Sequence, residues 1–183
     1  MGWGTCIFKS KPSYDEILAV ATKLRTRDRE EIYPLIFNAT PEQIAANHFN
    51  DGSRPQVDWV VSLLSHPVAI LGAVELFPGN WRVYFFATDQ CHEVIGHITK
   101  FIKTEMIPLL VDIGAHYVDC LSIDGDKKAS KWLKSLGAIK EANLNGYGKN
   151  KEDYSIYVWR LENVRDTWLK QTEASTNTTS ANA

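Results

Sequence analysis

Hydrophobic residues change their spacing several times along the chain, and each change predicts a new element. A first short strand is predicted at Cys6–Phe8. Ser13, followed three positions later by Glu16, has the pattern of a helix capping box. Apolar residues then recur at helical spacing as far as Leu24. The polar stretch Arg25–Glu31 ends or continues this helix.

A second helix is predicted from Thr40 to about Phe49. Thr40 can cap it, and Pro41 suits the first helical position. The pattern then changes to runs rich in Val, Leu and Ile, which are typical of strands joined by short turns at Ser65–His66 and Pro78–Asn80. The three strands of this meander are Asp58–Leu64, Pro67–Phe77 and Trp81–Ala87.

Helical spacing returns between Gln90 and Ile113. Pro108 lies inside this stretch and costs roughly 3 kcal/mol in a regular helix, so a kink or break is expected near Ile107. Gly114 is a plausible helix end. The remaining elements are a strand at His116–Ile123, a helix at Asp126–Leu136, a loop at Asn145–Asn150 that is flexible by composition, and strands at Ala138–Leu144 and Tyr154–Leu161.

The resulting order predicts an α/β fold. Strand, helix, helix, three strands, helix, strand, helix and two strands suit a mixed, mostly antiparallel central sheet of about seven strands with helices on both faces. Residues 1–170 form a single domain in this interpretation. Residues 171–183 have one charge and no aromatic side chain, which predicts a disordered polar tail.

Composition narrows the class of protein. Of 183 residues, 44% are hydrophobic and 23% are charged, as in soluble globular domains. With 20 Lys and Arg against 22 Asp and Glu, the net charge of −2 argues against nucleic acid as a partner. The longest uncharged run, Trp59–Val74, contains Pro67 and is too short to span a membrane. The three cysteines have no paired spacing and are expected to be reduced.

The element order and the segment DKKASKWLKSLGA at 126–138 resemble the GCN5-related N-acetyltransferase (GNAT) superfamily, over roughly Ile7 to Leu161. This resemblance implies a GNAT-like fold with acetyl-CoA as a possible cofactor. Three shorter segments, PVAILG at 67–72, VYFFATDQ at 83–90 and WLKSLGA at 132–138, are similar to the internal virion protein A family of short-tailed bacteriophages.

The second resemblance implies a role in virion assembly or structure. Its partners would be other phage virion or assembly proteins, or a host protein. Its location would be the host cytoplasm, with possible incorporation in the virion.

In GNAT enzymes a loop of the form Gln/Arg-x-x-Gly-x-Gly/Ala holds the pyrophosphate of acetyl-CoA with backbone N–H groups at a helix start. The matching positions here are Cys91, Val94 and Gly96, and only Gly96 fits. Val94 is expected to place a branched side chain where the phosphate should lie. The residues expected to hold acetyl-CoA, if it binds, are Cys91, His92, Glu93, Val94, Ile95, Gly96, Asp126 and Ala129.

A second GNAT signature is Asn-x-x-Ala-x-x-x-Tyr-x-x-x-Gly, whose Tyr often protonates the departing thiolate. The matching residues are Asp126, Ala129, Leu133 and Gly137. Leu133 cannot donate a proton, so the resemblance implies degenerate acetyltransferase chemistry.

Glu75 is the candidate general base if the protein is active, with Asp89 and Glu93 in the following loop as further carboxylates. The alternative for Glu75 is a solvated carboxylate facing outward on an alternating strand. No metal site is predicted, because Cys91, His92 and His97 lack the spacing of metal ligands.

Two functions remain open at this point. One is a non-catalytic GNAT-fold phage protein. The other is an active acetyl-CoA-dependent N-acetyltransferase that uses Glu75 or a water as base. Binding of the cofactor without turnover would indicate a ligand-sensing protein.

Overall fold

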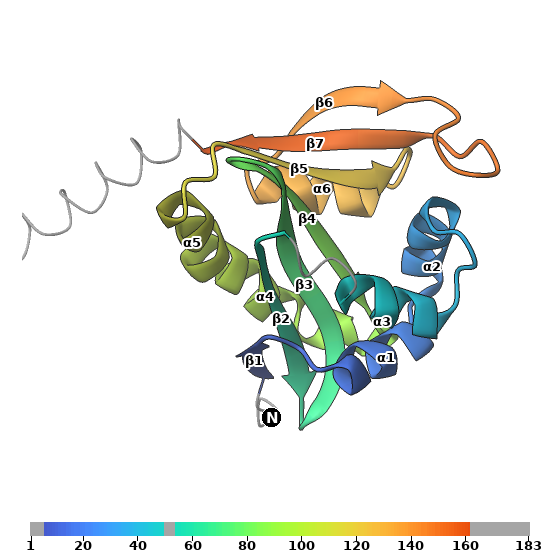
Figure 1. The fold of residues 1–183 in the computed structure, drawn as a ribbon, viewed down its shortest axis with the longest axis vertical. Coiled ribbons are helices and arrows are strands. Elements are labelled where there is room, and N and C mark those ends of the chain that lie inside the picture. The colour runs from blue at the N-terminus through green and yellow to red at the C-terminus, as the bar shows by residue number, and fades with distance from the viewer. Residues whose placement is uncertain (1–5, 50–53, 162–183) are drawn as a thin grey trace, which may run out of the picture.

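The computed structural model describes residues 6–49 and 54–161, which form a seven-stranded sheet with helices packed on it (Figure 1). In the sheet the strand order is β1-β2-β3-β4-β5-β7-β6, and β4 and β5 are the parallel pair. The predicted mixed, mostly antiparallel sheet is therefore confirmed. The strands are β1 (Cys6–Ser10), β2 (Gln56–Leu63), β3 (His66–Phe77), β4 (Asn80–Ala87), β5 (Tyr117–Ile123), β6 (Ile139–Leu144) and β7 (Tyr154–Arg160).

The helices confirm the expected order with one addition. The polar stretch at 25–31 forms a separate short helix, α2, instead of ending or continuing the first one. Ser13 and Glu16 make the predicted capping box at the start of α1. The helices are α1 (Tyr14–Thr22), α2 (Thr26–Ile32), η1 (Tyr33–Leu35), α3 (Pro41–Phe49), η2 (Asp89–Glu93), α4 (Ile95–Phe101), η3 (Ile102–Met106), α5 (Ile107–Asp112) and α6 (Lys127–Ser135).

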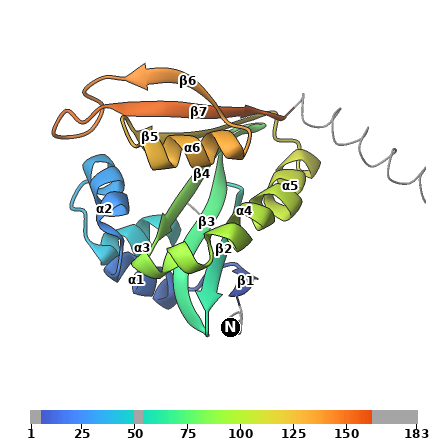
Figure 2. The ribbon, with the colours of Figure 1, turned by 180° about the vertical axis from the view of Figure 1, so that it is seen from behind.

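Both faces of the sheet are covered, as the alternation of side chains along a strand requires. On β3, Ile70 packs into a cluster with residues of α1 and α3. Its neighbour Leu71 packs into a second cluster with residues of α4, η3, α5 and α6. Figures 1 and 2 show the two groups of helices on opposite sides of β2–β4.

The hairpin between β2 and β3 turns one residue earlier than predicted. Leu64 and Ser65, not Ser65 and His66, form the turn, with φ values of 50° and 68°. Two consecutive residues with positive φ match the turn type that suits the twist of a two-residue hairpin. His66 is therefore the first residue of β3.

Pro108 produces the expected break in the helix at 95–112, in the form of a π-helical turn. Between α4 and α5 the turn η3 has its Ile107 N–H bonded to the carbonyl of Ile102, five residues back. Proline has no N–H to donate to the carbonyl four residues before it. The wider turn just upstream brings Met106 into the core.

The sheet opens between β4 and β5. Their ladder joins Asn80–Arg82 to Tyr117–Asp119 and, in the described part of the chain, stops there. Beyond this point β4 pairs with β3 and β5 pairs with β7, so the two strands diverge (Figure 1). Arg82 closes the junction with two hydrogen bonds to the Asp119 carboxylate, of 2.6 and 2.9 Å. We call the opening beyond this ion pair the fork.

The loop at 145–150, expected to be flexible, is held by hydrogen bonds. Gly146 N–H bonds the Asp153 carboxylate at 2.6 Å, and Lys149 N–H bonds the carbonyl of Pro34 at 3.1 Å. The predicted tail at 171–183 lies outside the described residues. Among those described, no helix is both long and apolar enough to cross a bilayer.

Candidate functional site in the fork

A cavity of about 670 Å³ occupies the fork. This volume is within the range of roughly 300–1,000 Å³ that is typical of small-molecule sites. Its walls come from β4, β5, α2, α3, α4, η3, α5 and α6, and most of its lining side chains are apolar. The polar minority includes Arg27, Asp28 and Glu31 of α2 and His48 of α3.

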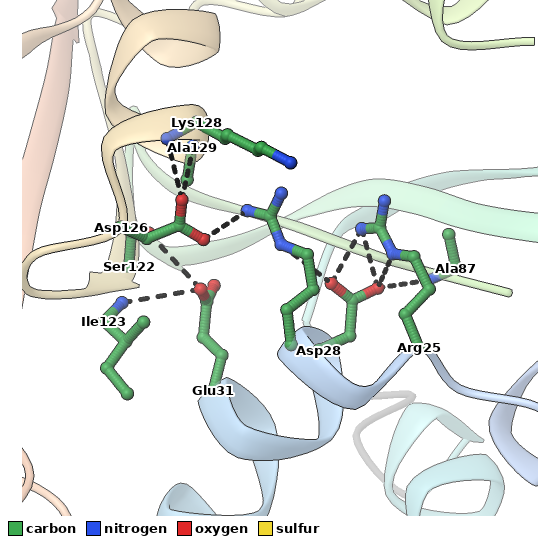
Figure 3. Close-up of polar contacts among 10 residues, drawn as sticks. Arg25, Asp28, Glu31, Ala87, Ser122, Ile123, Asp126, Lys128 and Ala129 are labelled. Carbon is green, nitrogen blue, oxygen red and sulfur yellow. Dashed lines mark hydrogen bonds and ion pairs between the residues drawn. The ribbon is translucent and has the colours of Figure 1, made fainter. Parts of the chain in front are cut away.

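Asp28 of α2 closes the outer edge of β4 where the strand ends. Its carboxylate receives two N–H groups of Arg25, at distances of 2.7–3.0 Å, and the backbone N–H of Ala87 at 2.7 Å (Figure 3). The Ala87 carbonyl accepts the N–H of Arg25 at 2.9 Å. Both backbone groups of Ala87 on this edge are therefore already bonded. Arg25 also lies over the ring of Phe85, 5.5 Å from its centroid.

The opposite side of α2 reaches the other arm of the fork. Arg27 Nη2 lies 2.7 Å from Asp126, the residue that caps α6. The Glu31 carboxylate accepts Ser122 Oγ–H at 3.3 Å and Ile123 N–H at 3.4 Å, at the end of β5. Helix α2 thus joins the ends of β4 and β5 across the opening.

Glu31 is a carboxyl group of the cavity lining whose pKa is raised into the neutral range. Burial raises its pKa from 4.5 to about 7, and the nearby Asp28 carboxylate adds to the rise, while Arg27 and the bond from Ile123 oppose it. A carboxyl with a pKa near 7 can take up or release a proton at neutral pH. The sequence pattern did not single it out, because it lies in a polar stretch without a motif.

Stability should respond to pH through Glu31. The folded form holds this proton between about pH 4.5 and 7 while the unfolded form does not, so its contribution to stability is lost as pH rises through 7. From pH 4.5 to pH 8 the free energy of unfolding of Glu31→Gln should therefore rise by about 1–3 kcal/mol relative to that of the wild type. Urea unfolding at both pH values measures this difference. Glu30→Gln, at the exposed neighbouring position, is the control and should show no such gain. If the free energy of unfolding of all three proteins depends on pH in the same way, folding does not raise the pKa of Glu31.

A second polar group lies near β2 and α3, and we call it the His48 cluster. It consists of His48, Gln56, Asp58 and Tyr84, of which all but Asp58 line the cavity. His48 Nε2 lies 2.5 Å from Asp58 Oδ2, and both side chains are mostly buried. Gln56 Nε2 donates to Asp58 at 2.9 Å and to the Tyr84 hydroxyl at 3.0 Å. Burial raises the pKa of Tyr84, so its phenol stays protonated.

The residues predicted to hold pyrophosphate lie at the start of α4, as expected, but Val94 behaves differently from the prediction. Its side chain is 1% exposed and packs into the core, so it does not block the loop. A Cβ added at Gly96 would meet nothing within 4 Å, so there is open space at this position. The backbone N–H groups of Cys91 and Val94, however, are bonded within the loop, to Thr88 and Cys91 carbonyls.

The other predicted cofactor residues divide into two sets. The cavity is lined by Cys91, His92, Ile95 and Ala129. Glu93 is exposed, and Asp126 caps α6 and pairs with Arg27.

Glu75 lies away from the cavity. Its carboxylate accepts the N–H of Gly79 at 2.7 Å, in the turn between β3 and β4. In the ladder between β3 and β4, Glu75 is opposite Trp81, at the end of the sheet where β4 and β5 are still hydrogen-bonded. Because β3 runs antiparallel to β4, the end of β3 is remote from the fork opening. The geometry therefore does not favour Glu75 as the base, and its role stays an untested prediction.

Leu133 lines the cavity at the position of the family's phenol, and two thiols line it as well. Burial raises the pKa of Cys91 to about 11 and that of Cys120 to about 12, so neither is a thiolate at neutral pH. Lys127, Lys131 and Lys134 are exposed on α6. Within the described ranges, His, Cys, Asp and Glu side chains do not gather in threes as metal ligands do.

Three features of the described residues differ from the acetyl-CoA site that the family resemblance implies. Gly96 leaves room for a phosphate, but two loop N–H groups are bonded internally. At the end of β4, both backbone groups of Ala87 that face the fork are bonded to Asp28 and Arg25, so a ligand in the fork cannot pair with this residue. The phenol is replaced by Leu133.

Comparison with known proteins establishes the fold. A candidate phosphinothricin N-acetyltransferase superposes with a TM-score of 0.65 at 13% identity, over 86% of this chain and 99% of the other. Ard1 from Thermoplasma volcanium gives 0.63 at 12%, over 84% and 96%. The ribosomal-protein-S18-alanine N-acetyltransferase from Escherichia coli gives 0.60 at 13%, over 84% and 92%. The chain therefore has the fold of the GNAT acetyltransferases. No family model and no curated protein matches the sequence.

Proposed function

We propose that this chain is a GNAT-fold protein of short-tailed bacteriophages that acts in virion assembly or structure, with degenerate acetyltransferase chemistry. The observation that supports a loss of chemistry is at the end of β4, where Asp28 and Arg25 bond both backbone groups of Ala87. Leu133 in place of a phenol supports it. The phage role is supported by the three short segments at 67–72, 83–90 and 132–138.

The assembly role is tested by fractionating infected cells. The protein should sediment with assembled particles or with assembly intermediates, detected by an antibody or by mass spectrometry. Partners would then be virion or assembly proteins, or a host protein bound to them. Exclusive recovery in the light soluble fraction throughout infection would overturn this role.

A second candidate is an acetyl-CoA-dependent N-acetyltransferase, and Glu31 is the observation that favours it. Its carboxylate lines the cavity and its pKa of about 7 suits proton transfer at neutral pH. In this interpretation Glu31, not Glu75, accepts the proton of the acceptor amine. Release of CoA that rises with pH through about 7 and is lost in Glu31→Gln would favour this candidate, while the same rate in both proteins would exclude Glu31 as the base.

A further inference from the structure

The wall of the cavity on the side of α4–α6 is a continuous aliphatic surface. It is formed by Ile95, Ile102, Met106, Ile107, Leu110 and Leu133. Met106, Leu110 and Leu133 are buried, and the others are half-buried. Met in particular adapts its shape to irregular apolar ligands. The substitution that removes the family's phenol, Leu133, thus also completes an apolar wall.

The π turn η3 contributes two of these side chains. Ile102 and Met106 are its first and last residues, and both line the cavity. Single π turns within α-helices occur frequently at functional sites, because they shift side chains away from regular helical positions.

One polar atom of the cavity residues has no partner. Arg27 Nε is buried without a hydrogen-bond acceptor among the described residues, and the Asp28 carboxylate lies 3.9 Å from it. The same guanidinium bonds Asp126 through Nη2 at 2.7 Å, so Nε is the group of Arg27 that lacks an acceptor. A single carbonyl or carboxylate oxygen would satisfy Arg27, whereas a ligand with many charges would find few free groups.

We propose that the fork cavity binds an aliphatic acyl chain of medium length, with its carbonyl or carboxylate oxygen at Arg27 and its methylenes against the aliphatic wall. An engineered apolar cavity of about 150 Å³ is enough to bind benzene. The fork cavity, at about 670 Å³, is several times larger than an acetyl group needs. This inference goes beyond the assembly role and does not depend on it.

Calorimetric titration of the 183-residue protein tests whether an acyl chain binds. Octanoyl-CoA is compared with acetyl-CoA, and octanoate with butanoate. Each buried methylene is worth about fourfold in Kd at most, so the longer member of at least one pair should bind at least about tenfold more tightly. A preference within the CoA esters alone, or within the acids alone, identifies the source of the chain. Equal Kd values within both pairs, or no binding of any probe, would overturn the proposal.

Three variants test whether the acyl chain binds in the fork cavity. Ile102→Trp should abolish the preference for the longer chain by filling the cavity, whereas Ile113→Trp, at an exposed site just after α5 and outside the lining, should keep it. Arg27→Gln should weaken both members of a pair and leave their ratio unchanged. If circular dichroism shows Ile102→Trp unfolded, Ile107→Trp replaces it. A preference that survives filling of the cavity would contradict this location.

Discussion

Asp28→Ala should lower the free energy of unfolding by about 3–5 kcal/mol, because removal of one member of a buried ion pair leaves the other uncompensated. The Asp28 side chain is 8% exposed and that of Arg25 is 16% exposed. The substitution removes the bonds to Arg25 and to the N–H of Ala87, the latter in the interior of the fold. Urea unfolding at pH 7 measures the loss.

Two controls separate the loss of the Asp28–Arg25 ion pair from a general effect of substitution in α2. Glu30→Ala, on the same helix but exposed, should change stability by no more than about 0.5 kcal/mol. Asp28→Asn keeps an acceptor for Ala87 and should lose less than Asp28→Ala. A loss below about 1 kcal/mol for Asp28→Ala would show that α2 does not hold the edge of β4.

Gly72→Ala should destabilise the protein by about 2–3 kcal/mol, since overpacking a filled site forces its neighbours to move. A Cβ at Gly72 would come within 2.6 Å of both Tyr84 Cζ and the carbonyl oxygen of Val57. The backbone oxygen cannot rotate away, so the strain falls on β2 as well as on the phenol. The Tyr84 hydroxyl accepts a hydrogen bond from Gln56, so movement of Tyr84 also disturbs the His48 cluster.

The control for Gly72 in β3 is Gly96, at the start of α4. Gly96→Ala meets open space in a helix and should be neutral or stabilising by up to about 1 kcal/mol. In a double-mutant cycle, Tyr84→Ala should cost less in the Gly72→Ala variant than in wild type, with a coupling of at least about 0.5 kcal/mol. A neutral Gly72→Ala variant would show that Tyr84 does not pack over β3 as described.

Much of the fold could be predicted because its signals are local. The capping box at Ser13, the cap at Thr40 and the cap at Asp126 each depend on side chains within three residues of a helix start. Pro108 predicted the broken helix for the same reason, although its form, a π turn, depends on how the turn packs. The sheet followed from element order, since few topologies accommodate it.

The site was harder to predict because it depends on contacts that are distant in sequence. Glu31 meets Ser122 and Ile123 more than ninety residues away, and no spacing rule connects them. Glu75 lies at the end of β3 that is away from the fork, and its position along the chain could not show which end of an antiparallel strand lies at the opening. Val94 was expected to block the phosphate, but its inward direction is set by the short 3-10 turn η2 before it.

Titration of the purified protein with acetyl-CoA most directly tests our proposal that the fork keeps the GNAT frame and its cavity without the family's cofactor site. We expect no saturable heat and no shift in melting temperature up to millimolar acetyl-CoA. A micromolar Kd, with stabilisation of about 2.7 kcal/mol at a hundredfold excess over Kd, would contradict the claim and favour an active acetyltransferase.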